Sequence, residues 1–324
     1  MRSVARASLL LLALASVAPA FAQTDAQFPS RAVRIVVPFP PGGPADIIAR
    51  VVAQRMSARW RQPVVVENRP GANTAIGAQA VAKSPPDGHT LLAAMDTTPV
   101  MNPLLTGNLP YDVKDFAPIT LLTRNMSLLV VRSDGPATAR ELIASAKAKP
   151  AKLNMGAGTI TSRLGALAFV RAAAIDVVLI PYKGSAEIVQ GLLSGSVDFA
   201  FDSTASSLPQ IQGGRFRALA KYSRRPFPAL PDLPSLPDAA GLPELDESAT
   251  WIGLLAPSGT PSAIIDAIQR EVAAAYADPA TMEKLERAGM FAVNSTPAEF
   301  QAFIDAETAR WSKVIRDNPQ IRLD

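Results

Sequence analysis

One stretch near the start of the chain reads Val33-Arg34-Ile35-Val36-Val37-Pro38-Phe39-Pro40-Pro41-Gly42-Gly43-Pro44-Ala45-Asp46. An apolar, β-branched run is followed there by a proline- and glycine-rich turn, and apolar residues then recur at helical spacing up to Met56. This pattern predicts a strand, a tight loop and a helix. Such a loop directs backbone N–H groups beyond the strand end, and the helix N-terminus adds partial positive charge. The arrangement suits an anion such as a carboxylate.

The same alternation continues along the chain. Further strands are predicted at residues 64–67, 90–94, 127–131, 153–155, 177–180, 197–201 and 217–220, with helices between most of them. Alternating strands and helices predict parallel α/β sheets, whose ligands bind beyond the carboxyl ends of the strands. A proline-rich stretch at 226–243 interrupts the pattern and is predicted to be an ordered surface connection. Two helices, starting near Thr260 and Thr296, are predicted to close the chain.

The first residues have the features of a secretion signal. Arg2 and Arg6 precede an apolar segment at residues 7–17, and Ala20-Phe21-Ala22 is a small-residue cleavage site, so we predict cleavage after Ala22. An uncleaved anchor is the alternative, but the apolar segment is too short to span a bilayer. The mature chain is therefore predicted to be exported and soluble.

Composition excludes several kinds of chemistry. Cysteine is absent and His89 is the single histidine, so disulfides, thiolate nucleophiles and multi-histidine metal sites are not expected. Removing Arg2 and Arg6 lowers Lys+Arg from 32 to 30 against 28 acidic residues, which leaves a formal charge of about +2. These basic residues are scattered, so nucleic-acid binding is disfavoured. No cofactor, no metal and no enzyme activity are predicted.

Six segments carry a resemblance to a known family and occur in that family's order over nearly all of the mature chain. They are Ile35-Val36-Val37-Pro38-Phe39-Pro40-Pro41-Gly42-Gly43, Val66-Glu67-Asn68-Arg69-Pro70-Gly71-Ala72, Ser84-Pro85-Pro86-Asp87-Gly88, Leu109-Pro110-Tyr111-Asp112, Pro181-Tyr182-Lys183-Gly184-Ser185 and Trp251-Ile252-Gly253-Leu254-Leu255-Ala256-Pro257. Together they resemble the Bug-type periplasmic solute-binding proteins, the receptors of tripartite tricarboxylate transporters.

The resemblance implies a type II periplasmic-binding-protein fold, with two α/β lobes, a hinge and a ligand cleft between the lobes. We expect lobe 1 to be discontinuous, at residues 27–122 and 223–324, and lobe 2 to be residues 123–222. The chain would cross between lobes near Leu122 and near Tyr222. A small organic carboxylate would bind in the cleft through loop amides, hydroxyls and ordered waters.

The first loop supplies Phe39, Pro41, Gly42 and Gly43 as candidate ligand contacts. The sequence alone is equally compatible with a plain strand–helix turn, and the resemblance favours binding, with the glycine amides on a carboxylate and Phe39 on the ligand body. Pro44 and Ala45 depart from the family's usual glycine and hydroxyl residue, which removes expected donors. Asp46 is expected to cap the helix rather than touch the ligand.

Two further groups of candidates follow the next predicted strands. Ala72, Asn73 and Thr74 form a second loop, in which Asn73 replaces a family glycine and would either donate to a carboxylate or tolerate a left-handed backbone. Thr97 and Thr98 follow a strand end, where their hydroxyls would face the cleft or cap the next segment.

The second lobe offers a loop that opens a helix. Gly158, Thr159, Thr161 and Ser162 are candidate contacts, and the loop lacks the third glycine of a dinucleotide-binding fingerprint. Arg163 stands at or next to a family histidine. It would clamp a second ligand carboxylate, or it would be an ordinary solvated arginine.

Three more candidates complete the expected site. Tyr182 and Gly184 follow a predicted strand, with Tyr182 lining the cleft and Gly184 offering its amide. Asp202 ends another strand, where it would accept a hydrogen bond from a ligand amine or hydroxyl, or brace the hinge. Trp251 is expected to pack in a core or hinge strand rather than stack on the ligand. His89 lies beside a predicted turn and is expected to have no catalytic role.

The leading hypothesis is a monomeric periplasmic receptor that closes over a small organic carboxylate and delivers it to a tripartite tricarboxylate-type membrane transporter. A receptor that reports its ligand to a sensor kinase is the nearest alternative. A secreted enzyme on the same fold and a ligand-independent interaction module are less favoured, because no catalytic constellation is supported by a motif.

Overall fold

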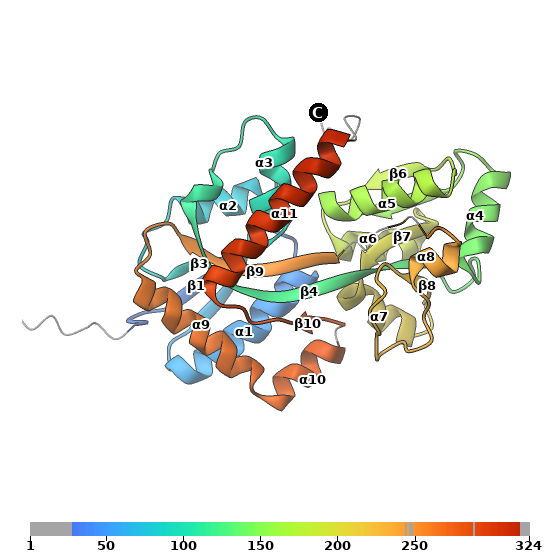
Figure 1. Cartoon of the computed structure of the whole chain (residues 1–324). Coiled ribbons are helices and arrows are strands. Elements are labelled where there is room, and N and C mark those ends of the chain that lie inside the picture. The colour runs from blue at the N-terminus through green and yellow to red at the C-terminus, as the bar shows by residue number, and fades with distance from the viewer. Residues whose placement is uncertain (1–27, 244, 246–248, 288, 318–324) are drawn as a thin grey trace, which may run out of the picture.

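The computed structural model describes residues 28–243, 245, 249–287 and 289–317. Ten strands form a mixed sheet in the order β2-β1-β3-β9-β4-β7-β5-β6, with β8 and β10 also pairing with β4, and helices cover both faces (Figure 1). The strands are β1 Val33–Val37, β2 Val64–Asn68, β3 Thr90–Met95, β4 Phe116–Arg132, β5 Asn154–Ala157, β6 Val178–Pro181, β7 Phe199–Ser203, β8 Phe216–Lys221, β9 Ala249–Pro257 and β10 Phe291–Ala292. The helices are α1 Pro44–Trp60, α2 Ala75–Ala82, η1 Thr97–Met101, α3 Asn102–Leu105, η2 Val113–Asp115, α4 Ala139–Ala148, α5 Ile160–Ala172, α6 Ser185–Ser194, α7 Thr204–Gln212, α8 Leu236–Ala240, α9 Ser262–Tyr276, α10 Pro279–Arg287 and α11 Pro297–Asp317.

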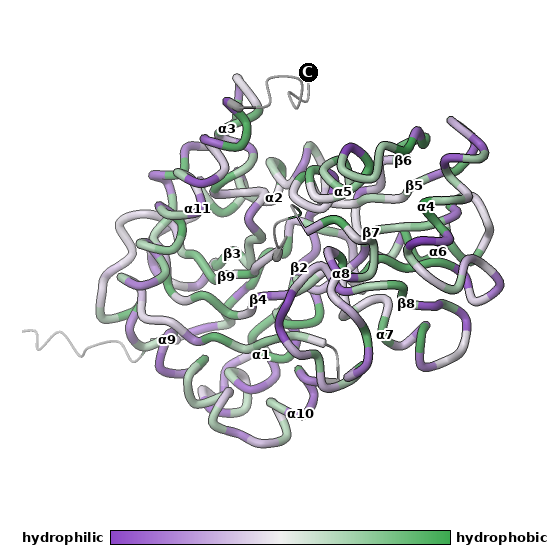
Figure 2. The backbone as a smooth tube through the Cα atoms, turned by 45° about the vertical axis from the view of Figure 1, so that its right-hand side comes forward, coloured by the Kyte–Doolittle hydropathy of each residue, from purple (hydrophilic) through white to green (hydrophobic). Residues whose placement is uncertain are grey.

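The first part of the sheet forms as its sequence predicts. β1 lies between β2 and β3 and is parallel to both. Alternate residues of β1 enter different cores: Val33, Ile35 and Val37 pack with α1 and α9, whereas Val36 packs with α2 and α11. Figure 2 shows the resulting concentration of hydrophobic residues along β3 and β9.

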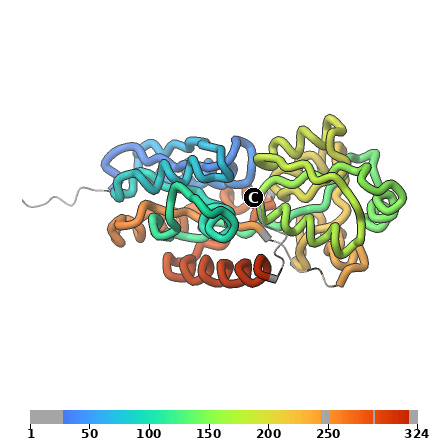
Figure 3. Tube along the Cα trace, turned by 90° about the horizontal axis from the view of Figure 1, so that it is seen from above, coloured from blue at the N-terminus to red at the C-terminus, as the bar shows by residue number. Residues whose placement is uncertain are grey.

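β4 is the strand that both parts of the sheet share. Residues 116–126 of β4 pair with β9, and residues 127–132 pair with β7 and β8. Two register irregularities, at Pro118/Thr120 and Leu121/Thr123, interrupt the pairing with β9. Seen from above, the N-terminal and C-terminal segments lie together on one side and the middle of the chain lies on the other (Figure 3).

The second part repeats the parallel arrangement. β5 lies between β6 and β7, parallel to both. α5 packs Phe169 against Phe201 of β7, with ring centroids 5.4 Å apart. On the other face, Ile188 and Leu192 of α6 pack on Val130 of β4.

Three expectations need correction. The sheet is mixed rather than parallel, because β9 and β4 run antiparallel to each other and to their neighbours β3 and β7. The strand expected at 127–131 is 17 residues long. Three helices rather than two close the chain, since α10 begins after Asp278, whose carboxylate accepts a hydrogen bond from the Thr281 amide. Four residues of the proline-rich stretch are buried: Phe227, Ser235, Leu236 and Pro237.

The domain limits stay a prediction. Leu122 falls inside β4, so a crossing there would run along a continuous strand. After β8, however, Leu236 and Leu245 still pack in the core of α4 and β8. The packing therefore favours a return near the start of β9 rather than at Tyr222.

Two further points concern the ends of the chain. The cleavage site predicted after Ala22 lies outside the described residues. Of the helices in the described part, none combines the length and apolarity that a bilayer crossing requires.

Candidate functional site

Four helix N-termini meet at one cavity that is partly open to solvent; the space unfilled by protein atoms there, open solvent included, is about 540 Å³. α1 contributes Gly43, Pro44 and Ala45, α5 follows Gly158 and Thr159, α6 follows Gly184, and α7 follows Asp202 and Ser203. Each of these helices follows a strand end, which is where α/β sheets place their ligands. Four positive dipole ends therefore point toward one space.

Two of the four helices lack a side-chain cap. The N-cap residues of α1 and α6 are Gly43 and Gly184, which have no side chain to accept the first amides. In the described part of the chain, no acceptor is found for the backbone N–H of Ala45, Ser185 or Ala186. By contrast, Thr159 and Ser203 cap α5 and α7 through their hydroxyls. The uncapped amides are thus available to a ligand anion.

Asp46 shapes the loop before α1. Its carboxylate accepts hydrogen bonds from the Gly42 amide at 3.0 Å and from Asn68 Nδ2 at 3.0 Å, and it pairs with Arg50. Burial opposes the charge of Asp46, but these hydrogen bonds and Arg50 hold the pKa of the carboxyl below its usual value. Asp46 therefore acts from the first turn of α1 as a brace for the loop. Gly43 is the N-cap itself.

This brace corrects one expectation about the loop. The Gly42 amide donates to Asp46, so it is not free for a ligand carboxylate. Gly42 has φ +86°, a conformation that favours glycine. Gly42 and Pro41 are exposed and do not line the cavity, whereas Phe39 and Gly43 do.

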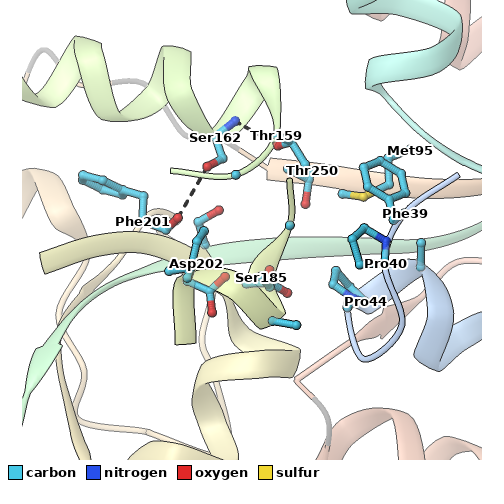
Figure 4. A pocket seen from close by; sticks show the side chains of 18 residues that line it. Phe39, Pro40, Pro44, Met95, Thr159, Ser162, Ser185, Phe201, Asp202 and Thr250 are labelled. Carbon is cyan, nitrogen blue, oxygen red and sulfur yellow. Dashed lines mark hydrogen bonds between the residues drawn. The ribbon is translucent and has the colours of Figure 1, made fainter. Parts of the chain in front are cut away.

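The cavity has an apolar side and a polar side. Figure 4 shows Phe39, Pro40, Pro44 and Met95 facing Ser185 and Asp202 across the space. Hydroxyl side chains from both parts of the sheet complete the polar wall: Thr159, Ser162, Ser127, Ser203 and Thr250. A ligand with a short hydrocarbon body and a polar end matches these two sides.

Asp202 is the only ionisable side chain on this wall, within the described residues. It is 2% exposed, and its Oδ2 accepts a hydrogen bond from Ser207 Oγ at 2.7 Å. Burial raises the pKa of Asp202 to about 6, although the donors nearby, the Ser185 and Ser207 hydroxyls and the Ser203 amide, partly oppose this. Among the residues that the structure describes, no arginine, lysine or histidine lines the cavity, so its attraction for anions comes from backbone amides and helix dipoles.

The second loop does not reach the cavity. Thr74 Oγ1 accepts hydrogen bonds from Thr98 Oγ1 at 2.9 Å and from Asn102 Nδ2 at 3.2 Å, and Tyr111 donates to the Thr98 carbonyl. Ala72 and Asn73 are exposed, and both have positive φ. Thr74 and Thr98 are thus used inside the protein, and the left-handed backbone is the better explanation of Asn73.

Other candidates also lie away from the cavity. Tyr182 lines a separate hollow with Glu187 and Gln190. Thr97 and Thr161 are buried and do not line the cavity. Burial lowers the pKa of Arg163, whose Nε has no hydrogen-bond partner in the described part of the chain, and Arg163 does not line the cavity either.

Seven of the seventeen sequence-predicted residues line the cavity. They are Phe39, Gly43, Gly158, Thr159, Ser162, Gly184 and Asp202. The wall residues missing from that prediction are Pro40, Pro44, Ala45, Met95, Ser127, Ser185, Ala186, Ile188, Phe201, Ser203 and Thr250. Several of these directly follow a predicted residue at a helix start, which is the signal that would have found them.

Near the cavity, Asp96 is a second buried carboxyl. It is fully buried at the end of β3, and burial raises its pKa to about 7, while the side chain of Thr161 from α5 partly offsets this. Ile160 and Leu164 of α5 pack in the same core as Trp251 and α11. The two parts of the sheet are therefore in close contact beside the cavity.

Comparison with known proteins identifies the family. The family model described as "Tripartite tricarboxylate transporter family receptor" matches residues 48–319. The chain therefore belongs to this family of periplasmic solute-binding receptors. It is 34% identical to BugT of Bordetella pertussis over 93% of this chain and 92% of that protein.

Solved structures agree with this assignment. An R. palustris protein with adipate has a TM-score of 0.85 and 33% identity, covering 89% of this chain and 97% of that one. MatC from Rhodopseudomonas palustris, with bound malate, has a TM-score of 0.81 and 29% identity, covering 89% of this chain and 100% of that one. The predicted periplasmic-binding-protein fold is confirmed, since the structure of the periplasmic binding protein BugD has a TM-score of 0.83 and 31% identity, covering 90% of this chain and 98% of that one.

Proposed function

We propose that this receptor captures a small organic carboxylate in the cavity between α1, α5, α6 and α7 and delivers it to a tripartite tricarboxylate-type transporter. The observation that carries the proposal is the meeting of four helix N-termini, two of them uncapped, at a wall whose described residues include no cationic side chain. The adipate and malate of the two structural neighbours belong to the ligand class that this wall favours. Delivery to a sensor kinase is the alternative.

We further propose that the two parts of the sheet act as lobes that close over the ligand. Pro40 from the first loop faces Gly184 from the N-terminus of α6, and a Cβ on Gly184 would lie 3.6 Å from Pro40 Cδ. These segments come from opposite parts of the sheet, so an opening motion would separate them. Export to the periplasm after cleavage at Ala22 and a monomeric state complete the proposal.

The test is a thermal-shift screen of the purified mature chain against mono- and dicarboxylates, with calorimetry on each hit. At least one small carboxylate is expected to raise the melting temperature, because a ligand that binds only the folded state stabilises it. Uncharged amides of the same acids serve as matched controls. The proposal of a carboxylate receptor would be contradicted if the amides stabilised the protein as much as the acids do, or if no acid stabilised it.

Because Asp202 lines the cavity, we expect the binding affinity for ligands that lack a hydrogen-bond donor, such as adipate, to depend on pH. The ionised carboxyl repels such a dianion, whereas the protonated carboxyl does not. Because burial raises the pKa of Asp202 to about 6, adipate affinity is expected to increase as the pH falls through this value. Calorimetry of the wild type and of Asp202→Asn measures the effect.

Dividing the wild-type affinity by the Asp202→Asn affinity at each pH cancels the titration of adipate itself, because both proteins meet the same ligand. This ratio is expected to rise as the pH falls, since only the wild type loses a repelling charge. A ratio that stays constant with pH would show that Asp202 does not titrate against the ligand.

A further inference from the structure

We propose that Asp202 makes the receptor selective for acids that carry a hydrogen-bond donor, a hydroxyl or an ammonium group, in addition to their carboxylate. This inference rests on the proposed function and specifies its ligand class. It depends on the hydrogen bonding of Asp202, on the charge of the wall and on the two sides of the cavity.

The hydrogen bonding of Asp202 is incomplete. Oδ2 accepts from Ser207, but Oδ1 is buried and has no hydrogen-bond partner within the described residues. A buried carboxylate oxygen without a donor is costly, because no hydrogen bond compensates for the water that it has lost. Since Asp202 lines the cavity, a ligand is in a position to supply the missing donor.

The charge of Asp202 also lacks compensation. Within the described ranges no cationic side chain lines the cavity, and hydroxyl and backbone donors there offset the burial of this carboxyl. A plain carboxylate would add a second negative charge beside it. A hydroxyl group would satisfy Oδ1, and an ammonium group would also neutralise the charge.

The position of Asp202 separates it from the anion-binding amide of α1, though not from the amides of α6. The uncapped amide of Ala45 comes from α1, on the side of Phe39 and Pro44, whereas Asp202 lies on the opposite side with Ser185 (Figure 4). A bound acid is therefore in contact with amide donors and with a carboxylate acceptor at different points. The Ser185 hydroxyl and the Ser203 amide are the competing donors that act on Asp202 from the wall.

The experiment compares matched pairs of acids by calorimetry above the pH at which Asp202 titrates. Malate and aspartate are each measured against succinate, and lactate is measured against propionate. In a pair that binds, the donor-bearing acid is expected to bind about tenfold tighter or more, since a hydrogen bond to a charged group is involved. Asp202→Asn is expected to reduce the preference for aspartate over succinate most strongly, because it removes the charge that attracts the ammonium group.

Asp266→Asn is the matched control, because Asp266 is exposed on α9, away from the cavity. It is expected to keep the wild-type preference. Thermal unfolding without ligand checks that both variants fold. The comparison of the two acids of each pair on the wild-type protein tests the preference even if a variant does not fold. Equal affinities within the pairs, or a preference that survives in Asp202→Asn, would overturn the proposed role of Asp202 but would leave the receptor function intact. If no acid binds, the proposed receptor function fails as well.

Discussion

Ser185→Pro is expected to weaken carboxylate binding by about 10- to 100-fold relative to Ser185→Ala. Both changes remove the hydroxyl, but only proline removes the backbone N–H. Ser185 is the first residue of α6, and its amide has no acceptor in the described part of the chain. The difference between the two variants therefore isolates one amide donor at the cavity.

The helix should tolerate this change. Proline is favoured at the first helical position, where the amide has no intrahelical partner. The preceding residue, Gly184, is extended, with φ 175° and ψ 176°, and so avoids the helical conformation that a following proline disfavours. We therefore expect the unliganded melting temperature of Ser185→Pro to stay close to that of Ser185→Ala.

Ser262→Pro provides the matched control. Ser262 is the first residue of α9, it is exposed, and it also follows an extended residue, Pro261. Proline there should leave ligand affinity unchanged in calorimetry. If Ser185→Pro and Ser185→Ala bind the same acid equally well, the α6 amide does not hold the ligand.

Trp251→Ala is expected to lower the free energy of unfolding by about 3–5 kcal/mol. Trp251 is 1% exposed on β9, and its ring meets Phe300 and Phe303 of α11 edge-on, with centroids 5.6 Å and 5.4 Å away. Alanine would leave a cavity between the sheet and α11. Equilibrium urea unfolding, followed by circular dichroism, measures the loss.

Trp251→Phe is the informative companion. It keeps an aromatic ring, and it removes an indole Nε1 that has no hydrogen-bond partner among the described residues. Its loss should be well below that of Trp251→Ala, and both variants should keep their ligand preference once folded. A loss of binding without a loss of stability would mean that Trp251 contacts the ligand, against its position in the core.

Local patterns were reliable where short segments determine their own structure. The β-branched run at 33–37 forms β1 and the Gly42-Gly43 turn leads into α1, because strand propensity and turn chemistry act over a few residues. The sequence also indicated that the site would use strand-end loops rather than histidine or cysteine. The length of β4, its pairing with two sets of strands and the antiparallel β9 were not predictable, because pairing depends on distant segments.

For the candidate site, the sequence by itself determined which residues start helices after strands, and so it located Gly43, Gly158, Gly184 and Asp202. Only the tertiary structure decided which of these starts meet. It brought four of them to one cavity and tied Thr74 and Thr98 into an internal network. In the folded chain the Gly42 amide donates to Asp46, whereas the Ser185 and Ala186 amides have no acceptor among the described residues. The physical reason is that a hydrogen-bonding group is available to a ligand only if the folded chain leaves it unpaired, and the partners come from residues far apart in sequence.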